Sequence, residues 1–267
     1  MTLEIRGLGR HSGVSRDAAA LARLVDVERR LESLHSALDI TGDSTAIGVI
    51  SLAFGHRARS LYFGVRHAVE GPSEATAQAA LRVLVEQTIV LPWLLLNPEV
   101  HPFLWKAEHE RHVRNLIRDA PTKAGSKFAA DLAAGVSANT LERLDRSVAE
   151  ARALAAEKGV VGVRKVGSLL PPLHAMTAQV GTPEAKEAYH IAYNMISGWT
   201  HSSAGGLGMF VTPAGVVFDE GPVEDTAPIR SMAAAAYLYM LEIVSREARL
   251  SIEDEARSLR RQLLAPW

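Results

Sequence analysis

The sequence predicts an all-α fold, a single-domain helical bundle of about eight helices with a small β-hairpin near residues 209–218. Apolar residues recur at three- and four-residue steps through most of the chain, which is the spacing of one helix face. Short breaks that contain glycine, proline or asparagine separate these stretches. Neither an internal repeat nor a shift in composition marks a second domain. We therefore expect a flexible N-terminal arm over residues 1–14 and one helical domain over residues 15–267.

The first half of the chain predicts four helices and a short fifth. The helical pattern starts near Ser15, and Gly71-Pro72-Ser73 and Asn97-Pro98-Glu99 interrupt it with turn residues. The stretch that begins at Ser44 is rich in small residues, which allow neighbouring helices to approach closely. The predicted helices cover residues 15–38, 44–69, 75–96, 101–118 and 121–133.

The second half predicts helices over residues 140–158, 169–180, 182–200 and 226–264. Pro171 and Pro172 weaken the prediction for 169–180, whereas Pro183 stands at the first position of its helix, where proline is favoured. The last helix is apolar up to Val244 and charged beyond it, with a break near Ser251. Before it, apolar residues alternate around Pro213-Ala214-Gly215, which predicts the small hairpin.

The composition excludes several classes of function. The 267 residues carry a formal net charge of -1 at pH 7, so no overall charge attracts nucleic acid or an anionic membrane. Cysteine is absent, which excludes disulfides, thiolate metal sites and cysteine nucleophiles within this chain. The N-terminal residues lack the apolar core of a signal peptide, so we expect a cytoplasmic protein with no membrane partner.

The predicted helix over residues 75–96 is apolar on nearly every face, which is typical of a helix in the centre of a domain. Its most apolar part is short for a membrane span and carries Arg82, Glu86 and Gln87, which favours a core helix. Arg82 and Glu86 are one turn apart on one face, and a buried charge is costly unless it is paired. The pair is therefore either a structural salt bridge or part of a site. In such a site Arg82 binds an anion, and Glu86 either orients Arg82 or acts as a general base.

A second group of polar residues lies in the predicted helix over residues 182–200 and the turn after it. Four of them follow a four-residue spacing and form one stripe: Tyr189, Tyr193, Ser197 and His201. His190 and Asn194 form an adjoining stripe. Histidine is the commonest general acid or base near neutral pH, so His201 is a candidate catalytic residue. The alternative is a polar seam in which His201 interacts with the helix C-terminus.

The segment Glu108-His109-Glu110-Arg111-His112 is typical of a solvated charged helix face, with Glu108 and His112 on the same side. A metal site is the alternative, because di-iron carboxylate bundles use two Glu-x-x-His motifs and two further glutamates. Glu187 and His190 form one such motif, and Glu86, Glu108 and His112 are the further candidate ligands. The second Glu-x-x-His motif is missing, so the sequence predicts neither a metal nor another cofactor.

Two motifs together resemble a known family. The stretch LRVLVEQTIVLPWLLLNPE, followed downstream by Tyr-x3-Tyr-x3-Ser-x3-His, resembles the bacterial domain-of-unknown-function family 5677, over about residues 45–245. The resemblance implies a helical fold, a bacterial origin and convergence of Arg82, Glu86 and His201. The residues that match the family's motifs are Arg82, Glu86, Trp93, Pro98, Tyr193, Ser197 and His201.

The chain is more distantly similar to helical HEPN-type proteins, many of which are ribonucleases in toxin–antitoxin or antiphage systems. Their motif places an arginine, a polar residue and, after about four further residues, a histidine on one helix. Arg114 and Asn115 begin this pattern, but Ala120 stands where the histidine is needed. The resemblance therefore implies ribonuclease action only if Arg82 supplies the cation from another helix.

The leading hypothesis is a polar pocket that catalyses metal-independent hydrolysis of a phosphodiester, with RNA or a small molecule as substrate. His201 is then the acid or base, Arg82 stabilises the anion and Glu86 orients Arg82. The substrate-binding residues are Tyr189, Tyr193, Asn194 and Ser197. The alternatives are a non-catalytic binding or dimerisation module, whose small-residue helix at 46–64 supports a homo-oligomer, and a metal-dependent helical oxidase.

Overall fold

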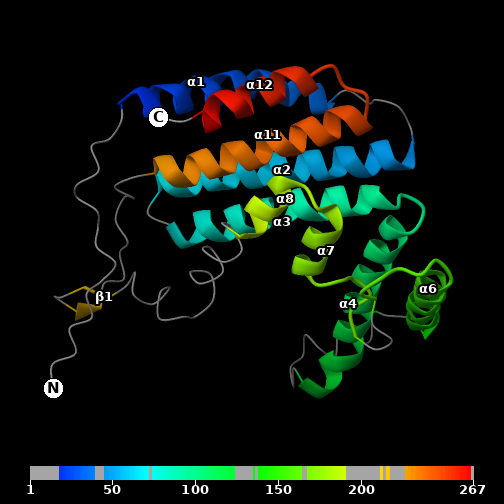
Figure 1. Ribbon diagram of the computed structural model, residues 1–267. Helices are drawn as coiled ribbons and strands as arrows, with labels where there is room; N and C mark the ends of the chain where they lie inside the picture. Colours follow the sequence, from blue (N-terminus) through cyan, green and yellow to red (C-terminus); the bar gives the residue numbers. More distant parts are fainter. Residues whose placement is uncertain are drawn as a thin grey trace. The chain divides into compact units, whose positions relative to one another are not determined.

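The computed structural model describes residues 18–39, 45–71, 74–123, 135, 138–163, 167–190, 211–212, 215–216 and 226–265. These residues form nine α-helices and one 3₁₀ helix, which confirms the all-α prediction (Figure 1). The chain divides into two compact units, one made of residues up to Leu91 and from Thr182 onward, the other of Pro92–Gly181. The expected single domain over residues 15–267 and the arm over residues 1–14 stay predictions.

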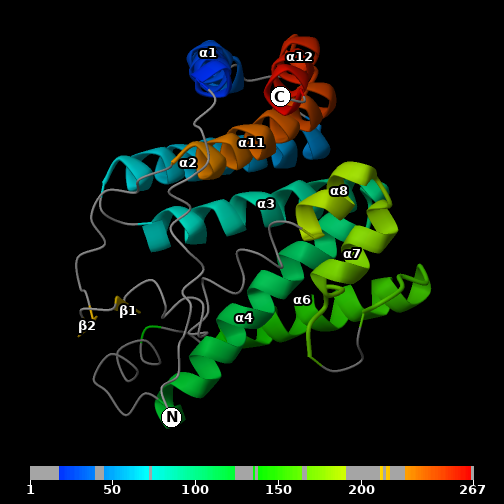
Figure 2. The ribbon, with the colours of Figure 1, turned by 60° about the vertical axis from the view of Figure 1, so that its left-hand side comes forward.

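The first unit is built in three layers, which both views show (Figures 1 and 2). One outer layer holds α1 and α12, the middle layer holds α2 and α11, and α3 lies on the other side of the middle layer. The last turn of α3, from Pro92 on, belongs to the second unit. The elements are α1 (Ala18–Leu34), the 3₁₀ helix η1 (His35–Asp39), α2 (Ala46–Glu70), α3 (Glu74–Leu96), α8 (Pro183–Glu187), α11 (Ala227–Glu247) and α12 (Glu253–Leu264).

The second unit contains α4 (His101–Lys123), α6 (Ala138–Glu157) and α7 (Leu173–Val180). Its core is a cluster of apolar side chains from α4, from α6 and from the segment before α7: Val100, Leu104, Ala107, Val148, Ala151, Ala155 and Leu169. Trp93 joins this unit, because its Nε1 donates to Gln179 Oε1 at 2.8 Å and its ring stacks on His101 at 3.9 Å. His101 Nδ1 donates to the Trp93 carbonyl oxygen at 2.7 Å.

The helix starts follow local capping chemistry. The Thr45 hydroxyl accepts a hydrogen bond from the Gly48 N–H at 3.0 Å, and the Thr182 hydroxyl accepts one from Ala185 at 3.2 Å. Pro183 occupies the first helical position of α8, as predicted. Such caps satisfy backbone donors that have no partner within the helix. The helix predicted over 169–180 begins only after Pro172, because proline favours a helix start over a helix interior.

Several predictions fall partly outside the described residues. The helix predicted over 121–133 is described only up to Lys123, which belongs to α4. The helix predicted over 182–200 is described to His190, and its residues 188–190 form a π-helical turn. Two two-residue strands, β1 (Val211–Thr212) and β2 (Gly215–Val216), pair antiparallel with Val211 opposite Val216. So short a ladder does not support the predicted hairpin over 209–218.

The break predicted near Ser251 is confirmed by the turn that joins α11 to α12. Arg249 adopts a positive φ of 56°, a conformation that ends a helix. The Ser245 hydroxyl donates to the Leu250 carbonyl oxygen at 2.6 Å and accepts from the Ile252 N–H at 3.3 Å. This turn returns α12 along α11, so the charged end of the chain packs beside the apolar helix (Figure 1).

The small residues of α2 serve close packing within the chain. A Cβ added at Gly55 would meet Leu38 Cδ2 at 3.1 Å and Val244 Cγ1 at 3.2 Å, so α11 and η1 approach the α2 backbone closely. At Gly64, on the same helix, the nearest atom would be the Ala80 Cβ at 3.9 Å. Gly55 therefore packs against its own chain. The predicted homo-oligomer stays a prediction.

We expect Gly55→Ala and Gly64→Ala to change the free energy of unfolding in different ways. Both substitutions gain up to about 1 kcal/mol of helix propensity. Only Gly55→Ala crowds Leu38 and Val244, which costs about 1–3 kcal/mol. Urea unfolding followed by circular dichroism should therefore give a larger free energy of unfolding for Gly64→Ala than for Gly55→Ala. Equal stability of the two variants would contradict the close packing at Gly55.

Candidate functional site

Arg82 and Glu86 form the predicted salt bridge, with Arg82 Nε 3.1 Å from Glu86 Oε1. Their side chains are 19% and 34% exposed, so the pair is only partly buried. The reason is that α3, although apolar in composition, buries one side through Leu81 and Ile89 while Ala79 on another side is exposed. The two charges lie at the edge of the buried face, where water still reaches them.

The predicted catalytic stripe lies mostly outside the described residues, which include neither Tyr193, Asn194, Ser197 nor His201. Of the same stripes, Tyr189 is half-buried and His190 is exposed. The convergence of His201 with Arg82 and Glu86, and the hydrolase hypothesis that needs it, therefore stay predictions. By length and composition Thr76–Leu96 is able to span a membrane, and half of that stretch is buried inside the protein. The cytoplasmic location also stays a prediction.

Glu108 is buried, so the prediction of a solvated charged face is wrong for this residue. Its carboxylate accepts hydrogen bonds from Arg111 at 2.7 and 2.9 Å, from the Ser168 hydroxyl at 3.1 Å and from the Leu169 N–H at 2.8 Å. His112 Nε2 lies 3.0 Å from the same carboxylate, and its side chain is exposed. Glu108 thus ties the segment before α7 to α4 within the second unit.

The metal alternative gains no support from the residues that the structure describes. Among them, no group of three or more histidine, aspartate or glutamate side chains is close enough to hold a metal ion. Glu108 already accepts hydrogen bonds from several donors, and Glu187 and His190 are exposed. The alternative metal site of Glu86, Glu108, His112, Glu187 and His190 therefore stays a prediction without support.

The hydrogen bonds to Glu108 predict a pH dependence of stability. Burial alone raises the pKa of Glu108, but the bonds from Arg111, Leu169 and Ser168 outweigh it, so the pKa lies below 4.5. The stabilisation is thus present above about pH 4.5 and is lost as the pH falls through the lowered pKa. Urea unfolding at about pH 7 and about pH 3.5 should show a smaller acid-induced loss in Glu108→Gln than in the wild type.

Glu142→Gln is the matched control, because Glu142 is exposed on α6 of the same unit. We expect this variant to lose as much stability on acidification as the wild type does. If Glu108→Gln and Glu142→Gln responded to pH alike, the bonds to Glu108 would not be the source of the effect.

A second buried carboxylate, Glu28 of α1, binds Arg230 of α11. Arg230 Nε donates to Glu28 Oε1 at 3.1 Å, and the Arg230 Nη2 also contacts Glu28 Oε2. Beside this pair, the Tyr62 and Tyr237 rings stack at 5.2 Å, and His35 Nδ1 lies 3.0 Å from the Tyr237 hydroxyl. Burial raises the pKa of Tyr62, so its hydroxyl stays protonated. This polar cluster fixes α1 onto the middle layer.

We expect Glu28→Gln to destabilise the protein more than Glu86→Gln. The Glu28 side chain is 5% exposed, so its charged hydrogen bonds contribute about 2 kcal/mol or more. The Glu86 pair is partly exposed and lies within one helix, where such pairs contribute less than about 1 kcal/mol. Urea unfolding of both variants measures the difference. A larger cost for Glu86→Gln would show that the pair on α3 matters more than its exposure implies.

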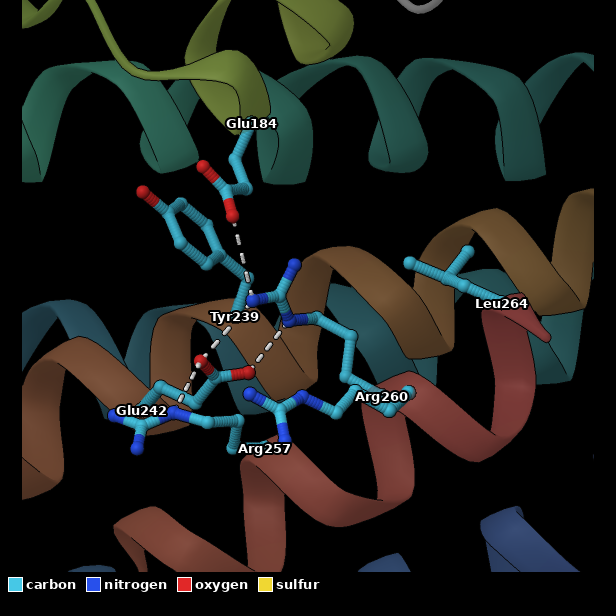
Figure 3. A pocket seen from close by; sticks show the side chains of 7 residues that line it. Glu184, Tyr239, Glu242, Arg257, Arg260 and Leu264 are labelled. Atoms are coloured by element: carbon cyan, nitrogen blue, oxygen red, sulfur yellow. Dashed lines mark hydrogen bonds and ion pairs between the residues drawn. The ribbon is translucent and has the colours of Figure 1, made fainter.

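A third buried carboxylate, Glu242 of α11, forms one wall of a cavity of about 510 Å³. Arg260 Nε lies 2.5 Å from Glu242 Oε1, and Arg260 Nη2 lies 3.2 Å from Oε2. Arg257 Nε is 3.7 Å from the same carboxylate, and Glu184 Oε1 of α8 is 3.7 Å from Arg260 Nη2. Figure 3 shows Glu184 and Glu242 on opposite sides of the Arg260 guanidinium. We call this space the charged cavity; its lining residues are Glu184, Tyr239, Glu242, Arg257, Arg260, Arg261 and Leu264.

A second cavity of about 310 Å³, the apolar cavity, lies between α3, α8, α11 and α12. It shares Glu184, Tyr239, Arg260 and Leu264 with the charged cavity, so the two meet at these residues. The rest of its described wall is mostly small or apolar: Val85, Thr88, Glu187, Ala188, Ser231, Met232, Ala235, Ala236, Leu263 and Ala265.

At the junction of the two cavities, Arg260 stays charged and Tyr239 stays neutral near neutral pH. Burial lowers the pKa of Arg260, but the hydrogen bonds to Glu242 outweigh it and the pKa is raised. Burial also raises the pKa of Tyr239, and a hydrogen bond with Thr182 opposes this only in part. The Arg260 guanidinium carbon lies 5.1 Å from the centre of the Tyr239 ring, within the range of a cation–π contact. The junction therefore presents a permanent cation beside a neutral hydroxyl.

Sequence reasoning missed Glu242, although a usable signal was present. Glu242 is a single charge within the apolar run from Tyr237 to Val244, which is the same kind of signal that Arg82 and Glu86 give. Its partner Arg260 lies 18 positions later, beyond the turn at Arg249, so one-turn spacing does not reveal the pair.

Comparison of the chain with protein-family models, curated proteins and solved structures finds no match in any of the three. The resemblance to domain-of-unknown-function family 5677 and to HEPN-type proteins therefore stays a prediction.

Proposed function

We propose that the protein is a non-catalytic binding module that holds a small, largely apolar molecule in the apolar cavity. The observation that carries the proposal is the wall of this cavity, in which eight of the fourteen described residues are alanine, leucine, valine or methionine. The other six are Thr88, Glu184, Glu187, Ser231, Tyr239 and Arg260. Small-molecule sites are typically concave and apolar, with a few placed polar groups and a volume of about 300–1,000 Å³. A cavity of about 310 Å³ favours a small molecule over a macromolecule.

The alanines of α11 account for the space. Ala233 and Ala234 are fully buried against neighbouring helices, whereas Ala235 and Ala236 are only half-buried and line the apolar cavity. Packed helices lie about 8–10 Å apart, a distance that longer side chains fill and alanine does not. The short side chains of α11 thus leave room opposite Val85 of α3.

The polar groups of the same wall suit orientation of a ligand better than catalysis. Tyr239 offers a protonated hydroxyl, and Arg260 offers N–H donors at the junction with the charged cavity. The hydrolase hypothesis needs His201, which lies outside the described residues, and it draws no support from either cavity. Binding without chemistry is therefore the function that the described residues support best.

Titration with N-phenyl-1-naphthylamine, a neutral probe whose fluorescence increases in apolar surroundings, tests this proposal. We expect saturable binding to the wild type and none to Ala235→Trp, because the indole fills the apolar cavity. Ala79→Trp is the matched control, since Ala79 is exposed on α3, and it should bind the probe like the wild type.

Circular dichroism melting checks that Ala235→Trp is folded. If that variant is not folded, Ala235→Val serves in its place and should weaken binding in part. The proposal is abandoned if the wild type does not bind the probe. It is abandoned equally if folded Ala235→Trp binds as tightly as Ala79→Trp does.

A further inference from the structure

We infer that the ligand of the apolar cavity carries an anionic head group, and that this group binds Arg260 and Arg261 in the place that Glu184 now occupies. The inference rests on the binding function proposed above and names the chemical class of the ligand. That class is an organic acid with a short apolar chain, such as a medium-chain carboxylate.

The geometry of the two cavities supports a ligand with one apolar and one charged end. They meet at Glu184, Tyr239, Arg260 and Leu264, which line both. A molecule whose chain lies against Met232 and Ala235 therefore extends toward the Arg260 guanidinium. Figure 3 shows this guanidinium between the carboxylates of Glu184 and Glu242.

Arg260 has hydrogen-bonding capacity left for such a head group. A guanidinium has about five N–H donors, and Glu242 accepts from Nε and from Nη2. Glu184 contributes only an ion pair at 3.7 Å, which is longer than a hydrogen bond. The Arg260 side chain is 16% exposed and lines the charged cavity, so a ligand carboxylate in that cavity can accept from its remaining donors.

Glu184 has the properties of a group that a ligand can displace. Its side chain is 38% exposed and belongs to the five-residue helix α8, so water can solvate the carboxylate once it leaves Arg260. Partly exposed ion pairs of this kind contribute little to stability. Glu242 differs, since its side chain is 8% exposed and its hydrogen bonds to Arg260 join α11 to α12. The exchange therefore takes place on the Glu184 side.

Arg261 supplies a second cation for the head group. It lines the charged cavity, is exposed, and forms no ion pair with any residue that the structure describes. Arg257 is less suitable, because Glu253, Asp254 and Glu242 surround it. Replacing the single charge of Glu184 by another single charge leaves the balance at Arg260 unchanged. Because Glu184, Glu187 and Glu242 also line the two cavities, a monoanionic carboxylate meets less repulsion there than a doubly charged phosphate does.

The test compares octanoate with octan-1-ol as competitors for bound N-phenyl-1-naphthylamine. The two molecules have the same chain length and differ in the charge of the head group. We expect octanoate to displace the probe at a roughly tenfold lower concentration, because charged hydrogen bonds are stronger than neutral ones. Octyl phosphate is the third competitor and should displace the probe less well than octanoate.

Two variants should change this preference in opposite directions, measured for each variant as the ratio of the octan-1-ol and octanoate concentrations that displace the probe. Arg261→Gln should weaken octanoate binding about fivefold, and Glu184→Gln should strengthen octanoate binding by up to about fivefold. Each substitution alters one charge that is at least partly exposed. Arg261 lines only the charged cavity, so Arg261→Gln should leave octan-1-ol binding unchanged. Both residues are at least partly exposed, so both variants should fold.

Equal displacement by octanoate and octan-1-ol, or octanoate binding that neither variant changes, would overturn the inference while the proposed binding function stands. If octyl phosphate displaced the probe at a lower concentration than octanoate, the inferred carboxylate would be wrong and the head group would be a phosphate. If the wild type does not bind the probe, the proposed function fails, and the inference that rests on it fails as well.

Discussion

The structure of the first unit depends on the pairing of the Glu242 carboxylate with Arg260. Removing water from a carboxylate is costly unless cationic hydrogen-bond donors replace it. Glu242 meets this need with a residue from α12, so α12 must lie along α11 in one register. The same register carries Arg261, Leu263 and Leu264 to the two cavities. The ion pair thus determines where the charged cavity is and which residues line it.

The same constraint recurs at the other buried glutamates among the described residues. Glu28 of α1 binds Arg230 of α11, and Glu108 of α4 binds Arg111 and the backbone before α7. Each fixes one element to another within its unit, while the partly exposed pair of Arg82 and Glu86 lies within a single helix. A buried glutamate therefore marks a contact between elements when its partner comes from another element. The proposed site lies where one such pair, Glu242 and Arg260, borders a cavity.

Structural features that depend on residues close together in the sequence were predicted well. The helix start at Thr182 and Pro183 and the break between α11 and α12 follow from local backbone chemistry. Pairs between distant residues could not be predicted, because Glu28 and Arg230 are 202 positions apart and nothing local relates them. The apolar composition of α3 also gave a misleading indication of burial. Arg82 and Glu86 stand in an apolar helix but lie at the edge of its buried face. The cavity depends on alanines of α11 facing α3, which only the packing reveals.

Methyl NMR of the wild type with labelled methionine tests most directly whether the apolar cavity binds an organic acid. The chain has six methionines; Met232 lines the apolar cavity, and Met176 is buried in the second unit. On addition of octanoate, the Met232 methyl signal should shift in a saturable manner while the Met176 signal stays in place. An unchanged Met232 signal at saturating octanoate, or a shift at Met176 instead, would contradict the account.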